Sequence, residues 1–256
     1  MENQGTVTAE VRGHIATIAF GHPASNSLPG KILKKLACTI SSFDNDESVR
    51  AIILKSEGDK TFCAGASFDE LIAIDTEEAG LAFFSGFAHV INAARKSPKI
   101  VVGRIQGKAV GGGVGLAAAC DYALATQDAS VKLSELAVGI GPFVVGPAVE
   151  KKIGTERYAQ LALDAKQWRT AAWAHQHGLY AEVYPDVQSL DEAVTAMAKQ
   201  FAQYNPEALT ALKRTIWKGT EDWDTLLIER AKISGRLVLS DFTRNAIELF
   251  KQKTVK

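Results

Sequence analysis

Short apolar stretches of strand length alternate with helical periodicity along the first 140 residues. The stretches RAIILKS at residues 50–56 and KIVVGRI at residues 99–105 are almost uninterrupted in their apolar character, which is typical of strands buried on both faces of a sheet. Strands that alternate with helices predict an α/β architecture. The other expected strands are the hairpin Val7–Val11 and His14–Phe20, then Thr61–Ala64 and Tyr122–Ala125.

Helical periodicity separates these strands and dominates after about residue 145. Pro29 opens a pattern in which apolar residues recur every three or four positions, typical of a helix with one buried face. The last periodic segment carries so much apolar surface that it is expected to pack against a second subunit, its own domain, or both. The expected helices run from Pro29 to about Phe43, up to about Lys96, and over Gly112–Cys120, Leu190–Tyr204, Pro206–Lys218 and Thr225–Lys253.

Composition narrows the class of protein. The chain has 29 basic and 29 acidic residues, so neither nucleic acid nor an anionic membrane is an expected partner. Three cysteines, Cys38, Cys63 and Cys120, show no metal-ligand spacing and favour a reducing compartment. The N-terminus lacks the basic and apolar regions of a signal peptide, and no apolar run approaches a membrane span. We therefore expect a soluble, cytoplasmic protein.

Two turns made of small residues are the most unusual feature of the chain: FCAGAS at residues 62–67 and AVGGGVGLAA at residues 109–118. The second matches the dinucleotide-binding pattern GxGxxA at Gly113–Ala118, which would indicate an NAD(P)-dependent oxidoreductase. However, residues 106–110 separate these glycines from the preceding strand, and the pattern leaves the first turn unexplained. The sequence therefore argues against a dinucleotide site.

Both turns are better suited to expose main-chain amides. Small residues do not shield their own N–H groups, and the first N–H groups of a helix attract oxyanions. Two such amides that converge on one carbonyl oxygen would stabilise negative charge as it develops there. The alternative is a pair of tight turns with a purely structural role.

At this spacing the two turns resemble those of the crotonase, or enoyl-CoA hydratase/isomerase, superfamily, and the resemblance runs nearly end to end. It implies a crotonase (ClpP/crotonase-like) spiral of ββα units at residues 1–195, and a C-terminal helical region at residues 196–256 that builds homotrimers or homohexamers. The similar stretches are HPASNSL (22–28), DESVRAIILKSEGDKTFCAGAS (46–67), SPKIVVGRIQGKAVGGGVGLAAACDYALAT (97–126), SELAVGI (134–140), KQWRTAAWAHQHGLYAEV (166–183) and NPEALTALKRTI (205–216).

The resemblance assigns the chemistry to a few residues. It implies an acyl-CoA thioester substrate whose enolate is stabilised by the N–H groups of Ala66 and Gly112, so a bulky residue at Gly112 is expected to lower the rate more than the stability. Hydratases of the family usually carry two glutamates; Glu135 matches the second, whereas Gly115 stands in place of the first. A carboxyl group beside an apolar acyl pocket is expected to have a raised pKa, which suits proton transfer near neutral pH.

The CoA-binding pattern of the family is only partly kept. The aspartate and lysine that commonly follow AGA are replaced by Ser67 and Asp69, which weakens the expected grip on the nucleotide. The matching positions for CoA binding are Ala64, His22, Phe250 and Lys253.

No metal and no cofactor other than the CoA of the substrate are expected. His175 and His177 lie two residues apart, on different faces of a helix, without acidic or cysteine partners.

The function expected from the resemblance is hydration of a 2-enoyl-CoA thioester. The loop VGIGPFVVGPAVEKKIG is similar to a branch of hydratases that includes methylglutaconyl-CoA hydratases of branched-chain catabolism, so the acyl chain is expected to be branched or carboxylated. The carboxylate of such an acyl chain could act as the base in place of the first glutamate, which Gly115 replaces. A single carboxylate also suits a 3,2-enoyl-CoA isomerase, and the absence of the first glutamate leaves a non-catalytic acyl-CoA-binding relative as a further alternative.

Overall fold

Six strands form the central sheet in the computed structural model, which describes residues 5–254, with side chains up to residue 249. A hairpin of β1 (Thr6–Arg12) and β2 (Ile15–Gly21) is antiparallel, and every later strand of this sheet is parallel to its neighbour. The predicted α/β class is therefore confirmed. The sheet continues with β4 (Ala51–Ser56), β7 (Ile100–Ile105), β9 (Tyr122–Thr126) and β11 (Glu182–Tyr184).

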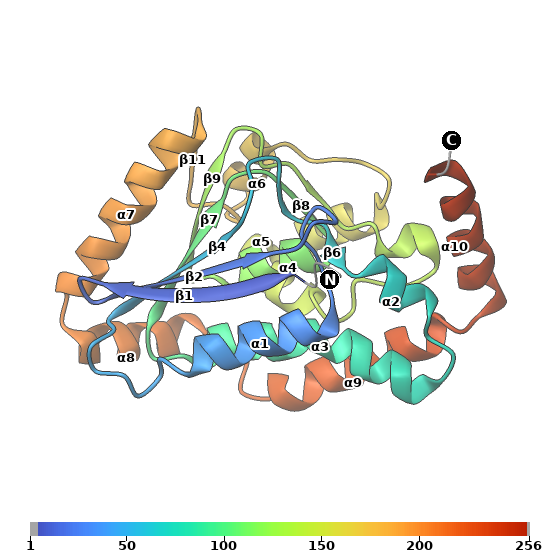
Figure 1. The fold of residues 1–256 in the computed structure, drawn as a ribbon, viewed down its shortest axis with the longest axis horizontal. Helices are drawn as coiled ribbons and strands as arrows, with labels where there is room; N and C mark the ends of the chain where they lie inside the picture. Colours follow the sequence, from blue (N-terminus) through green and yellow to red (C-terminus); the bar gives the residue numbers. More distant parts are fainter. Residues whose placement is uncertain (1–4, 255–256) are drawn as a thin grey trace.

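Helices cover both faces of this sheet (Figure 1). On one face lies α7 (Val187–Gln203), and on the other lie α1 (Gly30–Ser41) and α3 (Glu77–Lys96). In β4, Ile53 packs with the buried side of α7, whereas the adjacent Ile52 joins the main core on the other face. Successive side chains of a strand point to opposite faces. Both faces are buried here, which explains why these strands are apolar throughout.

Two small sheets bring distant segments together beside the central sheet. One joins β10, β8 and β5 in that order, and the other pairs β3 with β6. The helix α4 (Gly112–Ala119) begins directly after β8. As a result the two small-residue turns meet at one place in the fold. The bounds of these strands are β3 (Ser27–Leu28), β5 (Thr61–Cys63), β6 (Gly65–Ala66), β8 (Lys108–Val110) and β10 (Val131–Lys132).

The C-terminal helices differ from the expectation in one respect. The single helix expected over Thr225–Lys253 is wrong, because α9 (Trp223–Leu237) and α10 (Asp241–Thr254) are separate. Ser240 divides them: its Oγ accepts a hydrogen bond from the Thr243 N–H at 3.3 Å, which is an N-capping interaction that ends one helix and starts the next.

Much of the apolar surface of α9 is used within the chain. It packs along α3 so closely that a Cβ on Gly80 would lie 2.7 Å from the Cα of Gly235. The predicted boundary at residues 195 and 196 falls inside α7, and the division into two regions stays a prediction. The remaining helices are α2 (Phe68–Ile72), the 3₁₀ helix η1 (Glu135–Val138), α5 (Gly146–Leu163), α6 (Ala171–Gln176) and α8 (Pro206–Ile216).

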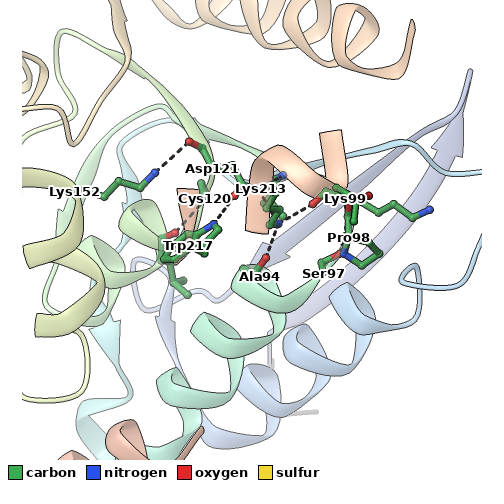
Figure 2. Close-up of polar contacts among 12 residues, drawn as sticks. Ala94, Ser97, Pro98, Lys99, Cys120, Asp121, Lys152, Lys213 and Trp217 are labelled. Carbon is green, nitrogen blue, oxygen red and sulfur yellow. Dashed lines mark hydrogen bonds and ion pairs between the residues drawn. The ribbon is translucent and has the colours of Figure 1, made fainter. Parts of the chain in front are cut away.

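A buried ion pair fastens α8 to the central sheet (Figure 2). Lys213 Nζ lies 2.7 Å from Asp121 Oδ2, and the two side chains are 3% and 4% exposed. The ammonium group also donates to the carbonyl oxygens of Ala94 and Lys99 at 2.8 and 2.7 Å. Asp121 accepts a further bond from Trp217 Nε1 at 2.7 Å. The charge is therefore fully hydrogen-bonded, as a buried ion must be.

Within residues 5–254, every helix is too short or too polar to cross a lipid bilayer.

Candidate active site

A cavity of about 710 Å³ opens beside the two small-residue turns. Ala64, Ala66, Gly112 and Glu135 line it, and most of the remaining wall is apolar. This volume lies in the range of sites for small organic ligands. The aromatic part of the wall comes from α2, from α3 and from the loop between the 3₁₀ helix η1 and α5, so Phe143 of that loop faces the cavity. The residues are Phe68, Phe83, Phe84, Phe87 and Phe143.

Ala66 and Gly112, whose main-chain amides are the expected oxyanion donors, both line this cavity. Ser67 N–H donates to the Leu28 carbonyl at 2.9 Å, and in a parallel ladder this pattern leaves the intervening Ala66 amide facing away from β3. Gly112 is the first residue of α4, so its N–H has no partner inside the helix. The two turns touch, since a Cβ on Gly65 would lie 3.7 Å from the Gly112 nitrogen.

Gly112 also has a packing role that the sequence did not reveal. A Cβ at this position would lie 2.2 Å from Cζ of Phe87, inside the aromatic ring. The ring is 5% exposed and belongs to the main core. A bulky residue at Gly112 would therefore disturb the core as well as the cavity, and the expectation that it affects the rate more than the stability is corrected on this point.

Glu135 begins η1 and turns its carboxyl group toward the backbone of Gly111. A Cβ on Gly111 would lie 2.8 Å from Glu135 Oε1, and Gly111 has a positive φ of 52°, so glycine is required there for two reasons. The other oxygen, Oε2, is buried and has no hydrogen-bond partner in the described chain. Burial raises the pKa of the Glu135 carboxyl to about 7, and main-chain donors at Ser134 and Glu135 offset this only partly.

The raised pKa of Glu135 predicts a dependence of stability on pH. A carboxyl with a folded-state pKa of about 7 and an ordinary value of 4.5 stabilises the fold fully below pH 4.5, and this contribution is lost as pH rises to about 7. The loss is on the order of 3 kcal/mol. Glu135→Gln does not ionise, so its free energy of unfolding should exceed that of the wild type increasingly from pH 4.5 to 7 and by a constant amount above. Urea unfolding at a series of pH values measures this difference, and a constant difference across the range would contradict it.

The position of the absent first glutamate is filled. A Cβ on Gly115 would lie 2.5 Å from Cγ1 and 2.7 Å from Cβ of Val145, which is 4% exposed. Ile91 Cδ1 lies 3.6 Å from the same point. No side chain fits at Gly115 unless Val145 shrinks or moves, so Gly115 is part of a packed core.

This packing predicts a compensating pair of substitutions. Gly115→Ala should lower the free energy of unfolding by about 1–3 kcal/mol, the usual cost of overpacking a core. Val145→Ala alone leaves a gap, and adding it to Gly115→Ala should restore part of the lost stability, so that the double variant is more stable than the sum of the two single effects. A double-mutant cycle measured by urea unfolding tests the coupling. Additive effects would show that Val145 does not limit this position.

The predicted CoA-binding residues fare differently. Ala64 lines the cavity. His22 does not, because it belongs to a turn in which its N–H donates to Asn26 Oδ1 at 2.8 Å and its ring accepts from the Ala24 N–H at 3.3 Å. Phe250 and Lys253 lie in α10, but their side chains are outside the described residues.

The structure adds residues to the site that sequence reasoning missed. Lys132 and Lys166 line the cavity, and Val145 closes it beside Gly115. The sequence feature that could have pointed to Lys132 is its position three residues before Glu135. In the part of the chain that the structure describes, no three histidine, cysteine or acidic side chains are grouped to hold a metal ion.

Comparison with known proteins identifies the family. The family model described as enoyl-CoA hydratase/isomerase matches residues 10–248. A "Probable enoyl-CoA hydratase" of Rhizobium meliloti is 30% identical over 240 residues, which are 93% of this chain and 90% of that protein. Mitochondrial methylglutaconyl-CoA hydratase of Rattus norvegicus is 31% identical over 86% of this chain and 68% of its own length.

A solved structure agrees in fold. The crystal structure of an enoyl-CoA hydratase from Bacillus halodurans superimposes with a TM-score of 0.87 at 24% identity, over 95% of this chain and 99% of that one. The predicted crotonase fold is thus confirmed. With a family model that spans nearly the whole sequence and relatives of matching length, the chain belongs to the enoyl-CoA hydratase/isomerase family of enzymes.

Proposed function

We propose that the protein hydrates a 2-enoyl-CoA thioester, with the N–H groups of Ala66 and Gly112 as oxyanion hole and Glu135 as the proton-transfer residue. The observation that carries this proposal is the meeting of all three groups in one apolar cavity. The names of the relatives, which are hydratases, support the reaction class.

The chemistry follows from the positions of these groups. When the oxygen of water bonds to C3 of the enoyl group, the electrons of the double bond move toward the thioester oxygen, which becomes negative. Two fixed amide donors stabilise that oxygen more in this state than in the substrate. Glu135 accepts the proton that the water loses and returns it to C2, which gives a 3-hydroxyacyl thioester. A carboxyl with a pKa of about 7 can do both steps near neutral pH.

A second candidate is the isomerisation of a 3-enoyl-CoA to the 2-enoyl isomer. Val145 occupies the space beside Gly115, where a second carboxylate would otherwise stand. Among the described residues that line the cavity, Glu135 is the acidic one. Isomerisation needs one group that takes a proton from C2 and returns it at C4. Glu135 suffices for that transfer, whereas in hydration it must also orient the water.

Incubation with crotonyl-CoA and with a 3-enoyl-CoA separates the candidates. Formation of 3-hydroxybutyryl-CoA, followed by mass spectrometry in ¹⁸O-labelled water, would support hydration. Conversion of the 3-enoyl substrate without uptake of ¹⁸O would favour isomerisation. Binding of both thioesters without turnover of either would identify a non-catalytic acyl-CoA-binding protein.

The acyl chain is the finer part of the proposal. We propose a short branched or carboxylated chain, because the cavity has a mainly apolar wall and because a relative named methylglutaconyl-CoA hydratase is 31% identical. The aromatic side chains of α3 provide contact surface for branched carbons.

A further inference from the structure

Two lysines interrupt the mainly apolar wall of the cavity. Lys132 and Lys166 both line it, although they are 34 residues apart in the sequence. Lys132 is half-buried and Lys166 is exposed, so water reaches both ammonium groups in the free protein, and an anionic group of a bound ligand can replace that water. The pair is therefore a candidate for binding an anionic part of the ligand.

The local backbone explains why these lysines come together. Val131 and Arg169 form an antiparallel bridge with hydrogen bonds of 2.8 and 2.9 Å. Side chains alternate across such a pair, so Lys132 and Trp168 lie together on the face opposite to the buried Val131. Lys132 Nζ is in fact 5.3 Å from the centre of the Trp168 ring. Lys166 precedes Trp168 in a turn in which the Gln167 N–H donates to the Asp164 carbonyl at 2.8 Å, and it too lines the cavity.

Positive charge gathers around the Trp168 ring on this face. Among the described residues neither Lys132 nor Lys166 forms an ion pair, and the nearby Arg169 is already engaged by Asp164. Lys108 adds a third charge, with its Nζ 5.5 Å from the centre of the Trp168 ring. The aromatic face stabilises these ammonium groups, but it does not neutralise them. An anion bound in the cavity would pair with Lys132 and Lys166.

The position of Lys132 identifies which anion it can reach. The Lys132 carbonyl accepts a hydrogen bond from Gly111 N–H at 2.9 Å, next to the proposed oxyanion donor Gly112. Lys132 precedes Glu135 by three positions, which places their Cα atoms at most about 11 Å apart. The phosphates of CoA are separated from the thioester by the whole pantetheine arm. A carboxylate a few carbons along the acyl chain fits this distance better than a phosphate does.

We infer that Lys132 and Lys166 form a subsite for a carboxylate on the acyl chain, so that the substrate class is a carboxylated short-chain acyl-CoA. This inference rests on the proposed function for the identity of the thioester. Lysine binds such a group as a mobile point charge, which suits recognition of acyl chains with the carboxylate at slightly different positions.

The test compares Lys132→Met and Lys166→Met with the wild type on glutaconyl-CoA, its terminal methyl ester and crotonyl-CoA. Loss of one hydrogen bond to a charged group corresponds to roughly 10- to 100-fold. We expect kcat/KM for glutaconyl-CoA to fall by this factor relative to the two uncharged substrates. Lys108→Met is the matched control, because Lys108 contacts the same tryptophan without lining the cavity, and it should leave this substrate ratio unchanged.

Other outcomes would overturn the inference. Equal losses on all three CoA substrates, absent with crotonyl-pantetheine, would show that the lysines bind CoA phosphates. Unchanged kcat/KM values for all three substrates in both variants would show that they bind neither anion.

A binding measurement keeps this test separate from the proposed reaction. Calorimetric titration with the saturated analogues glutaryl-CoA and butyryl-CoA needs no turnover. If the wild type binds glutaryl-CoA more tightly than butyryl-CoA and Lys132→Met loses this difference, the subsite is supported even without hydration. If only the proposed reaction is wrong, the thioesters bind but no product forms. Equal affinity for the two analogues in the wild type would refute the subsite.

Discussion

Replacing Glu135 with glutamine is expected to lower kcat/KM for a 2-enoyl-CoA by about 10²- to 10⁴-fold, the usual contribution of a positioned acid–base group. Glutamine has nearly the same shape as glutamate and keeps the contact with Gly111, but it cannot take up or release a proton at neutral pH. The affinity for a saturated acyl-CoA should change little, because the two amide donors and the apolar wall are retained.

Steady-state kinetics with crotonyl-CoA and calorimetry with butyryl-CoA measure these two effects. Glu156→Gln is the control, since Glu156 is exposed on α5 and does not line the cavity. If Glu135→Gln retained the wild-type rate, proton transfer would have to be assigned to another group or to the substrate itself. If it lost binding and rate together, the residue would be acting through the shape of the site.

Replacing Lys213 with methionine is expected to lower the free energy of unfolding by about 3–5 kcal/mol, the cost of breaking a buried ion pair from one side. Methionine fills a similar volume, but it leaves the Asp121 carboxylate buried without its counter-ion. The carbonyl oxygens of Ala94 and Lys99 lose their donor at the same time. The effect should be large because one ammonium group binds three buried acceptors at once (Figure 2).

Urea unfolding at a fixed protein concentration measures this loss. Arg214→Met is the matched control, because it removes a positive charge one residue further along α8 at an exposed position, and it should change stability by less than about 0.5 kcal/mol. Similar losses in both variants would show that the effect comes from helix propensity or net charge. Hydrogen exchange should also rise in α8 in Lys213→Met.

The fold was largely predictable because its strands are buried on both faces. In RAIILKS and KIVVGRI the burial of both faces leaves an uninterrupted apolar signature, and the structure places β4 and β7 there. The break between α9 and α10 was missed because apolar periodicity continues across Ser240, and only its hydroxyl cap marks the interruption. The short strands β6, β10 and β11 carry too few residues for a pattern of their own.

The site was predictable where backbone geometry dictates the residue type. Gly111 needs a positive φ and a close approach to Glu135, and such demands leave a visible mark on the sequence. Contacts between distant segments leave none: neither the filling of the Gly115 position by Val145 nor the packing of Phe87 on Gly112 follows from spacing. The two cavity lysines could not be predicted for the same reason, because a bridge between residues 131 and 169, which are distant in the sequence, brings their segments together.

The contact between Gly115 and Val145 constrains how this enzyme could change over evolution. A glutamate at residue 115 is blocked as a first step, because the new side chain would meet an occupied core before it could contribute to chemistry. The permissive step is the shortening of Val145, which has no immediate catalytic benefit and costs stability by itself. The order of substitutions is therefore fixed, and a designer who wishes to graft a second acid onto this scaffold should make room first and add the carboxylate afterwards.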